Sequence, residues 1–184
     1  MSPEVCGAIP SADLQLLLNA LTAKGYRVVG PAVRDGAVVW ETVKAIADLP
    51  IGWRDQQEPG RYRLKQTGSQ EIFGIVHGPQ SLKPFAFAPR EPLLQIERRP
   101  GGFAVHPHLP KSEKIAILGA RSCDLAGLAI QDQIFLNGPF RDPHYAARRE
   151  GLFVIAVNCT RALSTCFCSS RGTGPRARQG FDLA

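Results

Sequence analysis

No apolar run in this 184-residue chain approaches the roughly 20 residues that would span a bilayer. The first residues place Glu4 and Asp13 among leucines, unlike the basic start, apolar stretch and cleavage site of a secretory signal. We therefore expect a cytoplasmic protein with no membrane partner. Because the cytosol is reducing, clustered cysteines there are more often metal-binding or catalytic than disulfide-bonded.

Other absences narrow the functional class. No Ser-His-Asp order or paired carboxylate stands out, so we predict no hydrolase. No internal repeat is visible either. The stretch GTGPR lacks the lysine of a phosphate-binding loop and the third glycine of a dinucleotide fingerprint. The net charge of +6 comes mainly from scattered arginines with no aromatic ladder between them, so we expect no nucleic-acid partner. A local basic excess near the carboxyl end is typical of a solubilising face or a docking surface for an acidic partner.

The apolar patterning predicts an α/β chain with two regions, a mixed α+β region over 1–92 and a small parallel-type α/β region over 93–184 that carries the cysteine site. The predicted helices cover 11–24, 121–136 and 142–150, with a short helical turn over 81–87. The predicted strands cover 26–30, 37–41, 61–66, 70–78, 115–119 and 153–158, whereas 46–60 is expected to be irregular and 98–113 to be turn-rich.

Four of the five cysteines have a predicted place relative to this parallel sheet. Cys123 and Cys159 each follow a predicted apolar strand, so both thiols are expected at the carboxyl edge, where open α/β sheets bind ligands. Cys166 and Cys168 lie in a loop long enough to fold back over that edge, and side chains two apart in extended backbone point the same way. Cys6, near the amino terminus, is interpreted as incidental.

Four convergent thiols suit tetrahedral zinc or an iron-sulfur cluster held by cysteines. Around such an anionic group we expect Arg161 and Arg171 to supply positive charge, and Gly172 and Gly174 to free backbone N–H donors. The spacing alone leaves other interpretations open. The Cys166/Cys168 pair could serve thiol-redox or sulfur-handling chemistry, zinc could be purely structural, or the cysteines could be buried packing residues.

Several strings carry a family resemblance that covers most of the chain from about residue 10. The most specific are LGARSCDLAGLAIQDQIFL, DPHYAARR and VNCTRALSTCFCSSRGTGPRARQGFDLA, with LPIGWRDQQEPGRYRL and GPQSLKPFAFAPRE upstream. They resemble the beta subunits of cytoplasmic sulfhydrogenase-type nickel-iron hydrogenases and the related A subunit of anaerobic sulfite reductase.

The resemblance implies an iron-sulfur electron-transfer subunit rather than a catalytic one. It implies a 4Fe-4S type cluster, with Cys123, Cys159, Cys166 and Cys168 matching the family's cysteine pattern. The implied partners are a hydrogenase or reductase catalytic subunit and a flavin-containing, NAD(P)H-oxidising subunit. Family members continue past the final GFDLA into a region with ferredoxin-type cysteine runs. The resemblance therefore implies either a fragment or truncated gene product, or a protein whose clusters are reduced to this one site.

Overall fold

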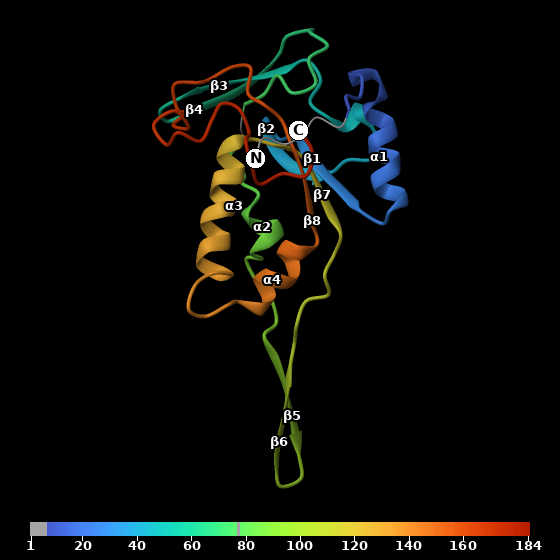
Figure 1. Cartoon of the computed structure of the whole chain (residues 1–184), viewed down its shortest axis with the longest axis vertical. Coiled ribbons are helices and arrows are strands. Elements are labelled where there is room, and N and C mark those ends of the chain that lie inside the picture. Colours follow the sequence, from blue (N-terminus) through green and yellow to red (C-terminus); the bar gives the residue numbers. More distant parts are fainter. Residues whose placement is uncertain (1–6, 77) are drawn as a thin grey trace.

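A computed structural model describes residues 7–76 and 78–184 of the chain, so Cys6 lies outside the described residues. Its main element is a four-stranded mixed sheet in the order β2-β1-β7-β8 (Figure 1). The helices are α1 (Leu14–Ala23), α2 (Lys83–Ala86), α3 (Ser122–Phe135) and α4 (Pro143–Glu150), with 3-10 turns at Ser11–Asp13 and Ile46–Asp48. The strands are β1 (Arg27–Arg34), β2 (Ala37–Thr42), β3 (Trp53–Glu58), β4 (Arg61–Gln66), β5 (Leu94–Arg99), β6 (Gly102–Pro107), β7 (Ile115–Ala120) and β8 (Leu152–Ala156). The predicted α/β class is confirmed.

The parallel part of the sheet is buried on both faces. Ile115 and Ile117 of β7 pack into a cluster with α3 and α4, whereas Ala116 and Leu118 pack into a second cluster with α1. Successive side chains of a strand point to opposite faces, which explains why all of β7 is apolar and buried. β1 and β8 run parallel to β7 on either side of it, so its carboxyl end lies in the middle of one sheet edge.

Local signals explain the ends of several elements. At the turn between β1 and β2, Asp35 and Gly36 both have positive φ angles, 48° and 74°, as a tight hairpin turn requires. The Asp142 carboxylate accepts the N–H groups of His144 and Tyr145 at 2.8 and 3.0 Å, and Pro143 occupies the first turn of α4. Asp142 is therefore the cap of α4, which matches the predicted start of a helix at residue 142.

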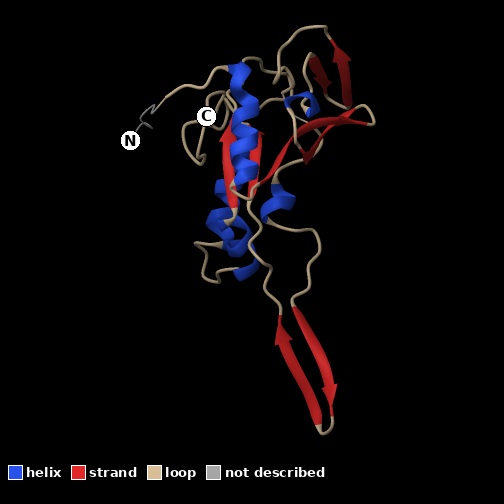
Figure 2. Cartoon of the chain, turned by 90° about the vertical axis from the view of Figure 1, so that its right-hand side faces the viewer, coloured by secondary structure: helices blue, strands red, loops and turns tan. Residues whose placement is uncertain are grey.

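Two hairpins differ from the sequence prediction. β3 occupies part of 46–60, which the prolines and glycines had indicated to be irregular, while the described residues of 70–78 form no strand. β5 and β6 form a two-stranded ribbon that projects from the molecule, so the segment expected to be turn-rich contains a full strand (Figures 1 and 2). Neither hairpin pairs with the central sheet.

The central sheet takes strands from both predicted regions. β1 and β2 precede residue 93, whereas β7 and β8 follow it, and β1 pairs directly with β7. Across the described part of the chain, no helix has the length and apolar character needed to cross a membrane.

Candidate functional site

The site is built at the carboxyl edge of the two central parallel strands. Cys123 lies in the first turn of α3, three residues beyond the end of β7, and Cys159 lies three residues beyond the end of β8. Because β7 and β8 are hydrogen-bonded parallel neighbours, both cysteines follow strands that end at the same sheet edge. The predicted placement of these two cysteines relative to their strands is confirmed.

The loop over residues 159–178 brings the other two cysteines to this edge. It runs beside β3 and β4 and over the start of α3 (Figure 1), where the Ser164 hydroxyl donates to the Gln57 carbonyl at 3.2 Å. Cys123, Cys159, Cys166 and Cys168 all line one cavity of about 420 Å³. Four thiols, one from α3 and three from this loop, therefore share one cavity.

The thiols suit a soft metal or cluster in kind and number, and all four are free. Within residues 7–76 and 78–184, however, no three Cys, His, Asp or Glu side chains lie close enough together to hold a metal ion. The four cysteines line one cavity, but the structure does not bring their sulfur atoms to the distances at which they would coordinate one metal.

Arg121 brings a positive charge into contact with a thiol. It is only 5% exposed, and its guanidinium donates to the Phe73, Ile75 and Asn158 carbonyls at 2.9, 2.6 and 3.2 Å. One of its nitrogens lies 3.9 Å from the sulfur of Cys159. Three carbonyl partners fix this charge beside the cavity, where it favours a thiolate over a thiol.

Two opposing effects act on Cys159. Burial raises the pKa of its thiol above the ordinary value, and the neighbouring Cys123 and Cys166 add to the rise, while Arg121 lowers it. Burial is the larger effect, so the pKa remains raised. A thiol in this state becomes a thiolate ligand most readily when a bound metal replaces its proton.

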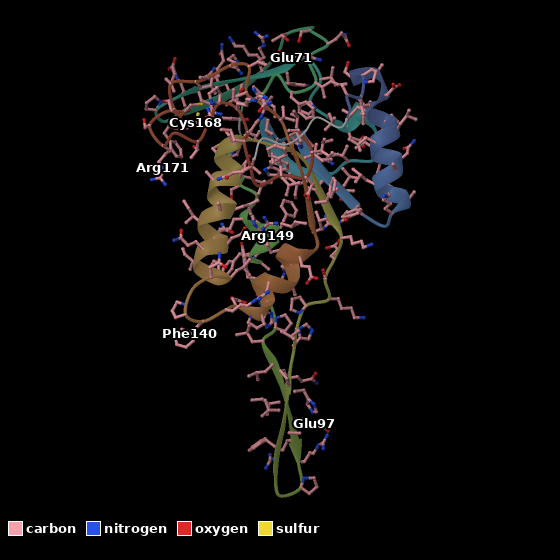
Figure 3. The ribbon with its side chains drawn as sticks, in the orientation of Figure 1. Glu71, Glu97, Phe140, Arg149, Cys168 and Arg171 are labelled. Carbon is pink, nitrogen blue, oxygen red and sulfur yellow. The ribbon has the colours of Figure 1, made fainter. Side chains whose placement is uncertain are left out.

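Arg161 holds the loop in place instead of facing the thiols. Its guanidinium lies 2.6 Å from the carboxylate of Asp55, a fully buried residue of β3, and also donates to the Asp55 and Gly74 carbonyls. The other predicted cation, Arg171, is exposed at the outer margin of the molecule, whereas Cys168 lies above the start of α3 (Figure 3). Positive charge is still plentiful, since the chain between Glu150 and Asp182 contains four arginines and no carboxylate.

The two predicted glycines have different roles. Gly172 adopts a positive φ of 64° in the loop, where nothing crowds its Cα. A Cβ at Gly174 would lie 2.4 Å from the Ser122 hydroxyl and 2.9 Å from the Cys168 sulfur. Gly174 therefore lets the loop pack directly against the start of α3, because any side chain would fill the space between them.

Sequence reasoning missed Arg121 and Asp55. Arg121 carried a weak signal, because a cation directly between a buried strand and a helix start must find buried acceptors. Asp55 carried none, because it lies in a segment whose prolines and glycines argued against a strand. Asp124, in the first turn of α3, accepts the Arg121 N–H on its carboxylate at 2.9 Å, as a helix cap does.

Comparison with known proteins adds one relative. No protein-family model and no solved structure matches the chain. The chain is similar to the sulfhydrogenase 2 subunit beta of Pyrococcus furiosus, with 29% identity over 124 residues, which is 66% of this chain and 35% of the relative. The chain thus spans about a third of the length of the curated protein it matches.

Proposed function

We propose that the chain is an iron-sulfur cluster-binding, electron-transfer part of a hydrogenase-type or sulfite-reductase-type oxidoreductase complex. The observation that carries the proposal is the shared cavity of Cys123, Cys159, Cys166 and Cys168 at the carboxyl edge of the sheet. The similarity to a sulfhydrogenase beta subunit supports the same class of complex.

The residues around the cavity supply what a cluster with thiolate ligands needs. Such a cluster carries single electrons at a potential set by charge, hydrogen bonds and burial. Arg121 places a fixed positive charge beside Cys159, and the start of α3 directs its backbone dipole toward Cys123. Gly174 lets the loop that bears Cys168 lie against that helix start.

We propose that binding closes the loop. Among the described residues, the segment after Cys159 forms no helix or named strand, and its backbone hydrogen bonds are isolated loop contacts such as Cys166 N–H to the Leu163 carbonyl. Its thiols can therefore move without breaking a helix or a sheet. Arg161 anchors the beginning of this segment to β3 and limits how far it can depart from the cavity. Cluster binding and ordering of the loop are then one event, as in other small metal-binding segments.

The proposed partners follow from the resemblance. They are a catalytic hydrogenase or reductase subunit and a flavin-containing, NAD(P)H-oxidising subunit, between which this chain passes electrons. The cationic loop suits contact with an acidic protein surface, since opposite charge speeds association and fixes orientation.

Anaerobic reconstitution with iron and sulfide, followed by visible absorption and electron paramagnetic resonance, tests the proposal. We expect a brown protein whose reduced form gives the signal of a 4Fe-4S type cluster. A variant with all four cysteines replaced by alanine should remain colourless. A parent protein that stays colourless and iron-free would overturn the proposal.

One observation favours a second candidate, thiol-redox or sulfur-handling chemistry at Cys166 and Cys168. Cys166 is exposed, and its sulfur accepts the Leu163 N–H at 3.3 Å, so the thiol is both accessible and held in a defined position. This candidate predicts rapid alkylation of one cysteine of the pair in metal-free protein at neutral pH. Metal analysis separates both candidates from structural zinc, which would give one zinc per chain and no redox signal.

A further inference from the structure

The β5–β6 hairpin is an arm that stands clear of the rest of the molecule (Figures 1 and 2). All residues of β5 and all but one of β6 are exposed. The arm is fully paired along its length, from Leu94 opposite Pro107 to Arg99 opposite Gly102. It is therefore a regular two-stranded ribbon whose residues do not belong to the hydrophobic core clusters.

The two faces of this arm differ sharply. Directly paired residues point to the same face, so Leu94, Ile96 and Arg98 share one face with their partners on β6. The large apolar side chains on this face, with their exposed fractions, are Leu94 (52%), Ile96 (60%), Phe103 (71%) and Val105 (59%). We call it the apolar face of the arm.

The opposite face is polar and internally paired. The Glu97 carboxylate lies 2.9 Å from the Arg99 guanidinium and 3.4 Å from the His106 ring. Gln95 and Ala104 complete this face. These charged and polar side chains favour contact with water. The alternation of residues along each strand therefore places the large apolar side chains on one face of the arm.

The base of the arm is held firmly to the body. Glu91, just before β5, accepts hydrogen bonds from His144 at 2.9 Å and Arg148 at 2.5 Å, both on α4. The His108 N–H donates to the Leu93 carbonyl at 3.0 Å and closes the ribbon at its base. The arm is therefore presented in a defined direction, although an isolated two-stranded ribbon is only marginally stable in water.

We propose that the apolar face of the arm binds another protein subunit, in an apolar groove that places a carboxylate opposite Arg98. An exposed apolar strip of this kind, flanked by polar residues, marks a protein-binding surface. Arg98 lies on that face near the tip and has no ion pair with any described residue. The proposal rests on the proposed function only in treating the chain as one subunit of a complex.

A second copy of the chain does not satisfy this face. The apolar face has one cation and, within β5 and β6, no carboxylate. Two arms stacked tip to base would leave each Arg98 buried against apolar side chains, and two arms stacked tip to tip would bring the arginines together. The net charge of +6 on each chain adds to the repulsion. We therefore assign this face to a different chain that carries negative charge beside an apolar groove, and a crosslink to a residue of the same polypeptide would contradict the assignment.

Site-specific photo-crosslinking in the organism that makes the protein tests the proposal. A benzophenone amino acid replaces Ile96 or Val105 on the apolar face, and Glu97 or Ala104 on the polar face serve as matched controls. We expect one adduct with a different protein, formed at least about tenfold more from the apolar-face positions, with Asp or Glu in the linked peptide. Adducts between two copies of this chain, equal yields from both faces, or no adduct would overturn the proposal.

Charge reversal tests the part played by Arg98. Arg98→Glu should lower the adduct yield from position 105 by about tenfold, whereas Arg99→Glu on the polar face should leave it within about twofold. Equal yields in the two variants would refute the carboxylate opposite Arg98. Iron content measured on the same preparations separates the two proposals, because a failed cluster assignment removes iron without changing the crosslinks.

Discussion

Arg161 joins the cysteine loop to the β3–β4 hairpin through an ion pair with Asp55, in which the carboxylate is buried and the guanidinium is partly exposed. Asp55 is fully buried, and the guanidinium of Arg161 neutralises it while also donating to two backbone carbonyls. Removing one partner of a buried pair costs far more than an exposed pair contributes, because the remaining charge stays in the interior. Arg161 is thus an important anchor of the loop to β3.

Replacement of this arginine should destabilise the whole fold. We expect Arg161→Met to lower the free energy of unfolding by about 3 kcal/mol, since the buried Asp55 carboxylate loses a charged hydrogen-bond donor. Arg171→Met, an exposed arginine of the same loop, should change it by no more than about 0.5 kcal/mol. Urea unfolding followed by circular dichroism measures both values. Similar losses in the two variants would show that Arg161 has no special structural role.

Glu91, at the base of the arm, contributes to the free energy of unfolding by an amount that depends on pH. Burial alone would raise its pKa, but the hydrogen bonds and charges of Arg148 and His144 outweigh burial and hold the pKa below its ordinary value. A group with a lowered folded-state pKa stabilises the protein above its unfolded-state pKa, and this contribution is lost as the pH falls through the folded-state pKa.

Glu91→Gln should therefore reduce stability in a pH-dependent way. We expect a loss of about 2 kcal/mol at neutral pH, and a difference from the parent that shrinks below about pH 4, the ordinary range of a glutamate. Glu97→Gln, in an exposed pair on the arm, is the control and should cost less than about 1 kcal/mol. Urea unfolding at a series of pH values measures the difference, and a constant difference across that range would contradict the assignment.

Among single residues, strand-end position was the most informative sequence signal. Cys123 and Cys159 could be placed because each follows an uninterrupted apolar run, and such runs identify buried parallel strands. Arg161 could be named as a neighbour of the site but not assigned a partner. Its partner Asp55 lies about a hundred residues earlier in sequence, and nothing local to either residue predicts their meeting.

At the scale of elements, the contact between the loop and α3 depends on a glycine. A Cβ at Gly174 would overlap the Ser122 hydroxyl and the Cys168 sulfur, both of which belong to the cavity wall. Any larger residue must push the loop away from the helix start.

Gly174→Ala should therefore weaken cluster retention. We expect roughly tenfold weaker binding of the reconstituted cluster, measured as the rate of iron release to a chelator. Gly127→Ala is the matched control, because Gly127 lines the same cavity from α3 but has open space around its Cα. That variant should retain the cluster and gain up to about 1 kcal/mol of helix stability. Faster iron release from Gly127→Ala than from Gly174→Ala would contradict the packing argument.

The loop itself should become ordered when the cluster binds. We expect trypsin to cut after the loop arginines in metal-free protein, and reconstitution to slow those cuts by at least about tenfold. Cleavage after Arg98 in the arm serves as an internal control and should not change. Mass spectrometry of timed digests measures both rates. Equal protection of loop and arm would indicate general stabilisation of the fold instead of closure of the loop.

Elements with a clear hydrophobic periodicity could be predicted from the sequence, whereas the β3–β4 and β5–β6 hairpins could not. α1, α3 and the β7 and β8 strands show clear helical spacing or unbroken apolar runs. β3 and β6 lie in segments rich in proline and glycine, which usually interrupt strands. In β6 the alternation of Phe103 and Val105 was present, but its apolar residues face solvent, so no core contact reinforced the pattern.

Over the whole molecule, the two proposed functional surfaces lie at opposite ends. The cysteine loop lies beside β3 and β4, and the arm extends from the other end of the molecule (Figure 1). A subunit bound to the arm would leave the thiol cavity accessible to a second partner. This arrangement suits a chain that connects two proteins, one held by the arm and one exchanging electrons at the site.

The central claim is that α3 and the loop contribute ligands to one cluster, and single-cysteine variants test it most directly. The measurement is iron and acid-labile sulfide per chain after anaerobic reconstitution of Cys123→Ala, Cys168→Ala and, as a control, Cys6→Ala. We predict that Cys123→Ala and Cys168→Ala both lose most of the iron, while Cys6→Ala retains the parent's content. Full retention of iron by Cys123→Ala, with loss in Cys168→Ala, would show that the loop binds its metal without α3 and would contradict the account.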